Sequence, residues 1–267
     1  MKRFDETAAG EKPIEGAAEK TTVGNYFISN YPPYSFWNEG ALGSLEGCLQ
    51  SSPVDDRPLG LYVHIPFCRK RCDFCYFKVY TDKNSKEVRR YLSGVASELD
   101  SYADVPYLKG RSPRFVYFGG GTPSYLSTAQ LEELFGALRE RIDWSDVEEV
   151  TFECEPGTLS LPKLQTLRDL GVTRLSLGVE NFNPTILERN NRAHRAEEIV
   201  RTYGFAREVG FPQVNIDLIA GMVGETDENW AHCIERTLEL GPDSVTIYQM
   251  EVPYNTTIYR RMKDDET

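Results

Sequence analysis

Three cysteines, Cys68, Cys72 and Cys75, follow one another within eight residues of the chain. Their C-x3-C-x2-C spacing lets three thiolates surround one small inorganic centre, and thiolate is the soft ligand that iron–sulfur clusters and zinc prefer. Structural zinc needs four protein ligands, but His64 lies inside an apolar run and the next cysteine is distant in sequence. The spacing therefore predicts an Fe–S cluster with one iron open to a small molecule, and zinc is the alternative.

Groups that could bind such a molecule follow the later apolar runs. Gly120, Gly121 and Thr122 form part of a glycine-rich turn, where a ligand can approach backbone that a Cβ would otherwise block. An amphoteric cofactor needs acceptors for its amine and hydroxyl groups and a cation for its carboxylate. The candidates for these contacts are Glu153, Asp217 and Arg192. Phe74 could stack on an aromatic ring of the cofactor or pack inside the loop.

Short β-rich runs alternate with amphipathic helical segments through most of the chain. The runs lie at 59–65, 114–118, 149–153, 173–178, 213–219 and 244–249. The helical segments lie at 87–102, 128–142, 161–170, 196–209 and 229–240. This order predicts an α/β fold, a partial (β/α)6 TIM-type barrel of parallel strands with outer helices. The site is expected at the carboxyl ends of the strands, where all the candidate groups lie.

The chain divides into three parts by composition. Residues 1–22 are predicted to be disordered, because they are charged and carry few bulky apolar groups. Residues 23–58 are predicted to form an irregular, aromatic N-terminal arm and a polar linker, with an aromatic substrate lid as the alternative for the arm. Residues 59–262 form the predicted partial-barrel domain.

Net charge and hydropathy limit the kinds of partner that the 267-residue chain is expected to bind. The formal net charge of −11 argues against a nucleic-acid-binding protein, because phosphate repulsion would be uncompensated. The sequence contains no apolar run long enough to span a bilayer and no apolar core of a signal peptide near its start. We therefore expect a cytoplasmic protein that does not bind nucleic acid.

The combined motifs resemble the radical S-adenosylmethionine (SAM) branch that contains oxygen-independent coproporphyrinogen III oxidase and the heme chaperones. The resemblance runs from about residue 59 to residue 262. The runs that carry it are Tyr62–Cys68 with Cys72 and Cys75, Gly119–Pro123, Arg174–Val179, Asn191–His194 and Val214–Gly221.

The resemblance implies a 4Fe–4S cluster on Cys68, Cys72 and Cys75 and a SAM molecule on its open iron. One electron, from a donor such as flavodoxin or ferredoxin, would cleave SAM to a 5′-deoxyadenosyl radical. That radical would oxidise a porphyrinogen-like substrate, so a tetrapyrrole is the implied small molecule. The implied cofactor contacts are Tyr62, Phe74, Gly120, Gly121, Thr122, Glu153, Glu180, Arg192 and Asp217.

Three features depart from the oxidase pattern. Phe77 stands where the oxidase has a further cysteine, and Glu180 stands where a glutamine is usual, so that a cofactor amide contact becomes a carboxylate. The C-terminal domain of the relatives is expected to be absent. Residues 248–251 look closer to the heme chaperones. A heme chaperone, a radical SAM methyltransferase or cyclopropanase, and a cluster-binding fragment without turnover are therefore alternative interpretations.

Overall fold

The structure is a computed structural model that describes residues 38–102 and 104–264. The chain forms two compact units, Met1–Cys48 and Leu49–Thr267. In the first unit, the described residues form a short 3-10 turn, η2 (Glu39–Ala41), and most of helix α1, whose full extent is Leu42–Leu49. The predicted disorder at 1–22 and the aromatic stretch up to residue 37 lie outside the described residues.

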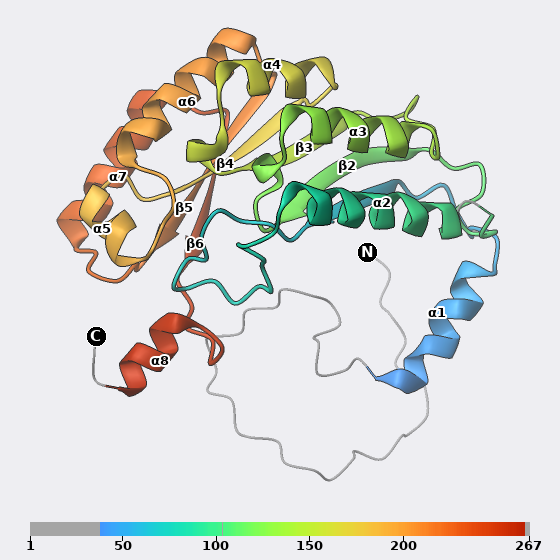
Figure 1. Ribbon diagram of the computed structural model, residues 1–267, viewed down its shortest axis with the longest axis horizontal. Helices are drawn as coiled ribbons and strands as arrows, with labels where there is room; N and C mark the ends of the chain where they lie inside the picture. The colour runs from blue at the N-terminus through green and yellow to red at the C-terminus, as the bar shows by residue number, and fades with distance from the viewer. Residues whose placement is uncertain (1–37, 103, 265–267) are drawn as a thin grey trace, which may run out of the picture. The chain divides into compact units, whose positions relative to one another are not determined.

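The second unit is built on a six-stranded sheet in which every neighbouring pair is parallel. Its strands are β1 (Leu59–Ile65), β2 (Pro113–Gly120), β3 (Glu149–Cys154), β4 (Arg174–Glu180), β5 (Gln213–Ala220) and β6 (Ser244–Gln249). They lie side by side in chain order, so β1 and β6 form the two edges of an open sheet. The sheet curves, and a layer of helices covers its outer side (Figure 1). The predicted partial barrel is confirmed.

The helices follow their strands as repeated βα units. They are α2 (Ser85–Tyr102), α3 (Thr128–Arg139), α4 (Leu161–Asp169), α5 (Pro184–Arg189), α6 (Ala196–Val209), α7 (Asp227–Leu240) and α8 (Thr257–Lys263). Local sequence fixes their ends. Ser127 and Gln130 form a capping box that begins α3. Gly210 and Gly241 end α6 and α7 in the left-handed conformation that favours glycine.

Strand residues alternate between a buried outer face and a polar inner face. In β2, Val116 and Phe118 are completely buried, and the ring of Phe118 stacks on Phe135 of α3 at 4.6 Å. Tyr117, between them, points to the other face and donates a hydrogen bond to Glu153 of β3. The core therefore lies between sheet and helices, and polar groups are left to line the inner side of the barrel.

Two helices differ from the sequence-based expectation. Helix α1 lies within the segment predicted to be an irregular arm, and its glycines, Gly43 and Gly47, lower helix propensity and hide the pattern. Helix α5 was not predicted, because its six residues are too few to show a helical period. Two further short 3-10 turns are η3 (Pro123–Tyr125) and η4 (Pro156–Thr158). Among the described residues, no helix is both long and apolar enough to cross a membrane.

Candidate functional site

The three cysteines lie in the loop that joins β1 to α2. This cysteine loop, residues 66–80, closes on itself, because Tyr80 N donates to Pro66 O at 2.8 Å and Cys68 N donates to Tyr80 O at 3.1 Å. A turn between Cys72 O and Cys75 N, at 3.1 Å, brings the second and third cysteines together. The closed loop holds the cysteines at the carboxyl end of the first strand, where the sequence predicts them.

The thiols of Cys68, Cys72 and Cys75 line one cavity of about 170 Å³. Two of them already accept hydrogen bonds: Thr122 Oγ1 donates to Cys68 Sγ at 3.3 Å, and Arg192 Nη1 donates to Cys72 Sγ at 3.1 Å. Such donors stabilise thiolates, the form that binds metal. Burial raises the pKa of Cys68 to about 11, so cluster binding must displace its proton.

The donor set matches a cluster better than a single ion. Across residues 38–102 and 104–264, no three His, Cys, Asp or Glu side chains converge closely enough to hold one metal ion. The three thiols nevertheless surround a shared cavity. A cluster takes each thiolate on a different iron, so its ligands stand further apart than those of one zinc ion. The residues present therefore fit a three-cysteine Fe–S cluster.

The glycine turn after β2 packs directly on the cysteine loop. Gly121 N donates to Ile65 O at 2.8 Å, and a Cβ added to Gly121 would lie 3.0 Å from Cys68 Sγ. Gly120 has φ of 118°, and a Cβ there would lie 2.5 Å from the ring of His64. Both positions thus require glycine, one for space and the other for space and conformation.

Three carboxyl groups, one buried and two half-buried, come from neighbouring strands at the mouth of the barrel. Glu153 of β3 accepts from Tyr117 Oη at 2.8 Å and from Gly120 N at 3.0 Å. Asp217 of β5 accepts from Ser176 Oγ at 2.7 Å. Burial raises the pKa of Glu153 and Asp217, and it raises the pKa of Glu180 to about 7. This group of acids favours a ligand that carries positive charge.

Arg192 lies between the acids and the cysteine loop. It forms an ion pair with Glu180 at 3.3 Å and donates from Nη2 to Gly178 O at 2.7 Å. Its Nε is buried and has no hydrogen-bond partner among the described residues. A buried guanidinium N–H without a partner is rare and indicates a place for an acceptor from a ligand.

The two aromatic candidates occupy different environments. Tyr62 of β1 is 56% exposed, and its Oη lies 3.0 Å from His64 Nδ1. Burial of its hydroxyl end raises the pKa of Tyr62 to about 12. Phe74 lines the cavity and packs against a small apolar cluster that includes Met222. The structure therefore places both rings near the mouth, with Phe74 the more enclosed.

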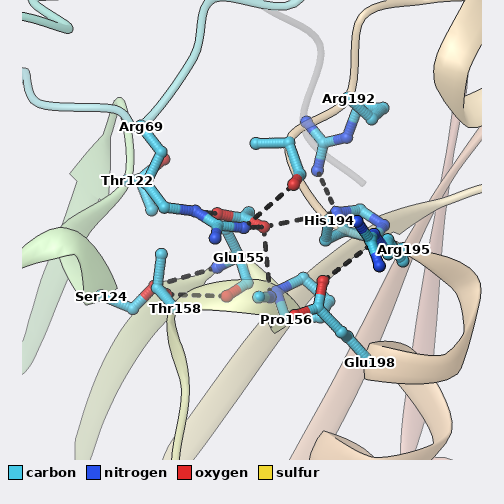
Figure 2. Close-up of polar contacts among 12 residues, drawn as sticks. Arg69, Thr122, Ser124, Glu155, Pro156, Thr158, Arg192, His194, Arg195 and Glu198 are labelled. Carbon is cyan, nitrogen blue, oxygen red and sulfur yellow. Dashed lines mark hydrogen bonds and ion pairs between the residues drawn. The ribbon is translucent and has the colours of Figure 1, made fainter.

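Sequence reasoning missed two residues beside this cavity, Glu155 and His194. Glu155 follows β3 and forms a two-pronged ion pair with Arg69, at 2.9 and 2.7 Å (Figure 2). His194 is 3% exposed, and its Nε2 lies 3.2 Å from Val179 O. The sequence did show a second acid, Glu155, two residues after Glu153. The direction of its side chain depends on where β3 ends, which is at Cys154.

The cysteine loop also contacts α8, near the far end of the described residues. The amides of Thr257 and Ile258 donate to Asp73 O at 3.0 and 3.2 Å. The side chain of Arg261 pairs with the Asp73 carboxylate, which is 5% exposed. Ile258 is itself buried. Helix α8 therefore fixes the middle of the cysteine loop.

Comparison with known proteins agrees with this geometry. Residues 62–237 match the Radical SAM superfamily. The oxygen-independent coproporphyrinogen III oxidase of Escherichia coli (strain K12) is 37% identical over 210 residues, which cover 78% of this chain and 46% of that protein. The heme chaperone HemW of the same strain is 32% identical over 212 residues, 78% of this chain and 56% of HemW.

A solved structure gives the same result. The structure described as coproporphyrinogen III oxidase (HemN) from Escherichia coli, a radical SAM enzyme, superposes with a TM-score of 0.75 and 34% identity, covering 86% of this chain and 52% of that one. The chain spans about half of the length of these relatives. Members of the superfamily use a 4Fe–4S cluster and SAM. The chain belongs to the Radical SAM superfamily, in the branch of the oxygen-independent coproporphyrinogen III oxidases and the heme chaperones.

Proposed function

We propose that Cys68, Cys72 and Cys75 hold a 4Fe–4S cluster at which SAM is reductively cleaved, and that the protein thereby oxidises a porphyrinogen-like substrate. The observation that carries the proposal is the single cavity that the three thiols share with Arg192 and the glycine turn. The oxidase relative supports the choice of substrate class. An electron donor such as flavodoxin or ferredoxin belongs to the proposal as the source of the electron.

The cofactors would supply one-electron cleavage of a carbon–sulfur bond, which yields a radical strong enough to take hydrogen from an unreactive carbon. The chain's own groups bind and orient. Glu153 and Asp217 accept from the hydroxyl and amine groups of SAM, and Arg192 donates to its carboxylate. Tyr62 and Phe74 provide apolar surface that keeps water away from the radical precursor. Glu180 adds a carboxyl oxygen that accepts a hydrogen bond from the cofactor.

The glycine turn completes this assignment. Gly120, Gly121 and Thr122 offer backbone groups to the cofactor. The two glycines have no side chain and that of Thr122 is short, so the cofactor can approach the backbone closely. The Thr122 hydroxyl, which donates to Cys68 Sγ, supports the thiolate at the same time. Binding and cluster support are therefore combined in one turn.

The decisive experiment is anaerobic reconstitution followed by incubation with dithionite, SAM and coproporphyrinogen III. We expect about four irons per chain, release of 5′-deoxyadenosine, and vinyl product detected by mass spectrometry. Cys72→Ala should lose the cluster and the deoxyadenosine, whereas Cys48→Ser, an exposed cysteine in the other unit, should retain both. Equal deoxyadenosine formation by the Cys72→Ala protein would rule out the cluster assignment.

A heme chaperone is the second candidate, and Phe77 favours it. Phe77 is 48% exposed beside the cavity and stands where the oxidase has a further cysteine. HemW relatives match about the same share of the chain. Stoichiometric heme retention without consumption of coproporphyrinogen would support the chaperone. Formation of S-adenosylhomocysteine beside deoxyadenosine would instead identify a methyltransferase.

A further inference from the structure

A short segment between α5 and α6 runs beside the cysteine loop. We call residues 190–193 the backing strip. Four hydrogen bonds join the strip to the loop: Asp73 N to Asn190 O at 3.2 Å, Asn191 Nδ2 to Arg71 O at 2.9 Å, Arg192 Nη1 to Cys72 Sγ at 3.1 Å, and Arg69 Nη2 to Ala193 O at 3.1 Å. The first residue of the strip, Asn190, contacts Asp73 and the last, Ala193, contacts Arg69, so the two segments run in opposite directions. The strip thus contacts the loop throughout the stretch between the first and third cysteines.

The backing strip is itself held rigidly. Asn190 is completely buried and exchanges two hydrogen bonds with the backbone of Val223, at 3.0 and 3.1 Å. Asn191 has φ of 60°, the left-handed conformation that asparagine tolerates. A strip anchored at its start in this way can serve as a fixed surface for the loop.

Arg69 is the link between the strip and the end of β3. Its guanidinium donates from Nε and Nη2 to both carboxylate oxygens of Glu155, and from Nη2 to Ala193 O as well. Figure 2 shows the Arg69 and Glu155 side chains facing each other at the centre of this network. A planar two-pronged pair fixes orientation as well as distance. Arg69 follows Cys68 directly, so the pair fixes the loop beside its first cysteine.

Contacts other than the ion pair with Arg69 also hold Glu155 in place. The Glu155 amide donates to Ser124 Oγ at 3.0 Å, and its Oε1 accepts from Gly157 N at 3.1 Å. The side chain is 8% exposed. A Cβ at Gly157 would collide with Arg69 Nη2, so this glycine leaves the space that the guanidinium fills. The carboxylate therefore has one geometry, and Arg69 must adapt to it.

His194 does not provide a second ionic partner for Glu155. Its Nδ1 lies 3.6 Å from Glu155 Oε1, but burial lowers the pKa of His194 to about 2, so the ring is neutral. Val179 O can only accept, which places the His194 proton on Nε2 and leaves Nδ1 to accept from Arg192 Nη2 at 3.5 Å. His194 thus supports Arg192, and Arg69 is the partner that the Glu155 carboxylate orients.

We propose that Glu155 is a positioning residue for the cysteine loop: it locks Arg69 against the backing strip and so fixes Cys68 relative to Cys72. The inference rests on the proposed function, because a fixed spacing matters only when the cysteines share a cluster. Partners one step away from metal ligands typically change metal retention by about 10-fold to 100-fold when they are removed. Glu155 and Arg69 should act as one unit, since each depends on the other.

The test measures iron loss from the reconstituted protein to an excess of a ferrous chelator under anaerobic conditions. Wild type, Glu155→Gln, Arg69→Gln and the double variant are compared. We expect each single variant to lose iron at least about tenfold faster. The double variant should be no faster than the quicker single variant, because the same interaction is removed twice. Arg89 and Glu133 form an exposed pair between α2 and α3, so Glu133→Gln is the matched control with unchanged iron loss.

The reduction potential of the cluster distinguishes a positioning effect of the Arg69–Glu155 pair from an effect of charge alone. Glu155→Gln removes a negative charge beside the cavity and should raise the cluster potential, whereas Arg69→Gln removes a positive charge and should lower it. Positioning alone predicts faster iron loss in both. Arg69 is 37% exposed, so Arg69→Gln is the variant that should fold even if burial makes Glu155→Gln unstable.

The outcomes are distinguishable. Iron loss by Arg69→Gln at the wild-type rate, or additive effects in the double variant, would overturn the inference and leave the cluster assignment standing. Failure of the wild-type protein to take up iron would overturn the proposed function together with the inference. Unfolding of the metal-free variants, followed by circular dichroism, shows whether faster iron loss reflects the loop or the whole fold.

Discussion

Glu180 has a left-handed backbone conformation, is buried, and lies beside Arg192. It has φ of 64°, a left-handed conformation that costs about 1–3 kcal/mol outside glycine and asparagine. It is 9% exposed, and its carboxyl lies 3.3 Å from the guanidinium of Arg192. Strain of this kind persists only where the surrounding structure enforces it. The strain is therefore consistent with the cofactor contact proposed for Glu180.

The pH dependence of stability should reveal this carboxyl group. Burial raises the pKa of folded Glu180 from the ordinary 4.5 to about 7. Between these values the unfolded chain has lost the proton while the folded protein keeps it, so stability falls as pH rises. We expect the fall in the free energy of unfolding between pH 5.5 and 7.5 to be about 2 kcal/mol smaller in Glu180→Gln, measured by urea denaturation.

The control for this prediction is Glu133→Gln, which neutralises a carboxylate that is 51% exposed. Its pH dependence should follow that of the wild-type protein. The same slope in Glu180→Gln and wild type would mean that Glu180 is ionised in the folded protein throughout this range.

The role of a single residue can be predicted from the sequence where a motif constrains it. Prediction is harder where the register and the end of a strand determine which way the side chain points. The cysteines and the glycine turn have spacings that only a few sites share. Glu153 and Glu155 are chemically alike and two residues apart in sequence, yet Glu153 lies on the inner face of β3 and Glu155 turns toward Arg69 after the strand ends. The end of β3 at Cys154 makes that difference, and a sequence pattern locates such ends only approximately.

At the scale of elements, the glycine turn after β2 joins two loops that the sequence presents separately. Gly121 N donates to Ile65 O and Thr122 N donates to Phe67 O, both at 2.8 Å. These bonds extend the pairing of β1 with β2 into the cysteine loop. Hydrogen bonds to the sheet therefore hold the start of the cysteine loop in place.

Gly121→Ala should damage this junction more than an ordinary glycine replacement. The new Cβ would lie 3.0 Å from both Cys68 Sγ and Phe67 O, and the backbone oxygen cannot move freely. We expect the free energy of unfolding of the metal-free protein to fall by about 1–3 kcal/mol and iron uptake on reconstitution to fall with it. Denaturant titration and iron analysis provide the two measurements.

Gly136→Ala is the matched control. Gly136 lies inside α3, and a Cβ there meets nothing within 4 Å. Alanine is the better helix former, so this change should raise the free energy of unfolding by about 0.5–1 kcal/mol. A loss of stability in both variants would show that the site-specific contact of Gly121 is not responsible.

The elements themselves were largely predictable because parallel strands buried by helices leave strong apolar runs. The predicted strand 59–65 coincides with β1, and 244–249 coincides with β6. The predicted helix 128–142 continues past the end of α3 at Arg139, since the apolar period persists after the helix ends. Prediction failed for α5, because its six residues are too few to show a helical period, although Asn183 caps its start and Pro184 occupies its first turn.

At the scale of the second unit, the ion pair between Asp73 and Arg261 joins positions near its two ends. No sequence pattern indicates this contact, because it depends on the barrel bringing α8 back to the first loop. The folding of all six strands therefore contributes to the shape of the cysteine loop. The order of the strands was predictable, but the partner of Asp73 was not.

Arg261→Ala should loosen this contact. It would leave the Asp73 carboxylate, which is 5% exposed, without its ionic partner. Since Arg261 itself is 42% exposed, water replaces part of the interaction, and we expect the free energy of unfolding to fall by roughly 1 kcal/mol. The amides of Thr257 and Ile258 should exchange hydrogen faster in this variant.

Arg260→Ala is the comparison, because the Arg260 side chain contacts Thr257 Oγ1 on its own helix. Its effect on amide exchange near Asp73 should be small. Equal exchange in Arg261→Ala and Arg260→Ala would show that the ion pair does not hold α8 in place.

The bonds from Thr257 and Ile258 to Asp73 O have a thermodynamic consequence. A ligand that binds the cysteine loop more tightly when α8 is docked shifts α8 toward the docked position, and by reciprocity docking of α8 favours the ligand by the same factor. Hydrogen exchange at residues 257–263 is then a remote reporter of whether the cysteines are occupied. It could follow cluster insertion in a mixture of loaded and empty protein without any spectroscopic signal from iron.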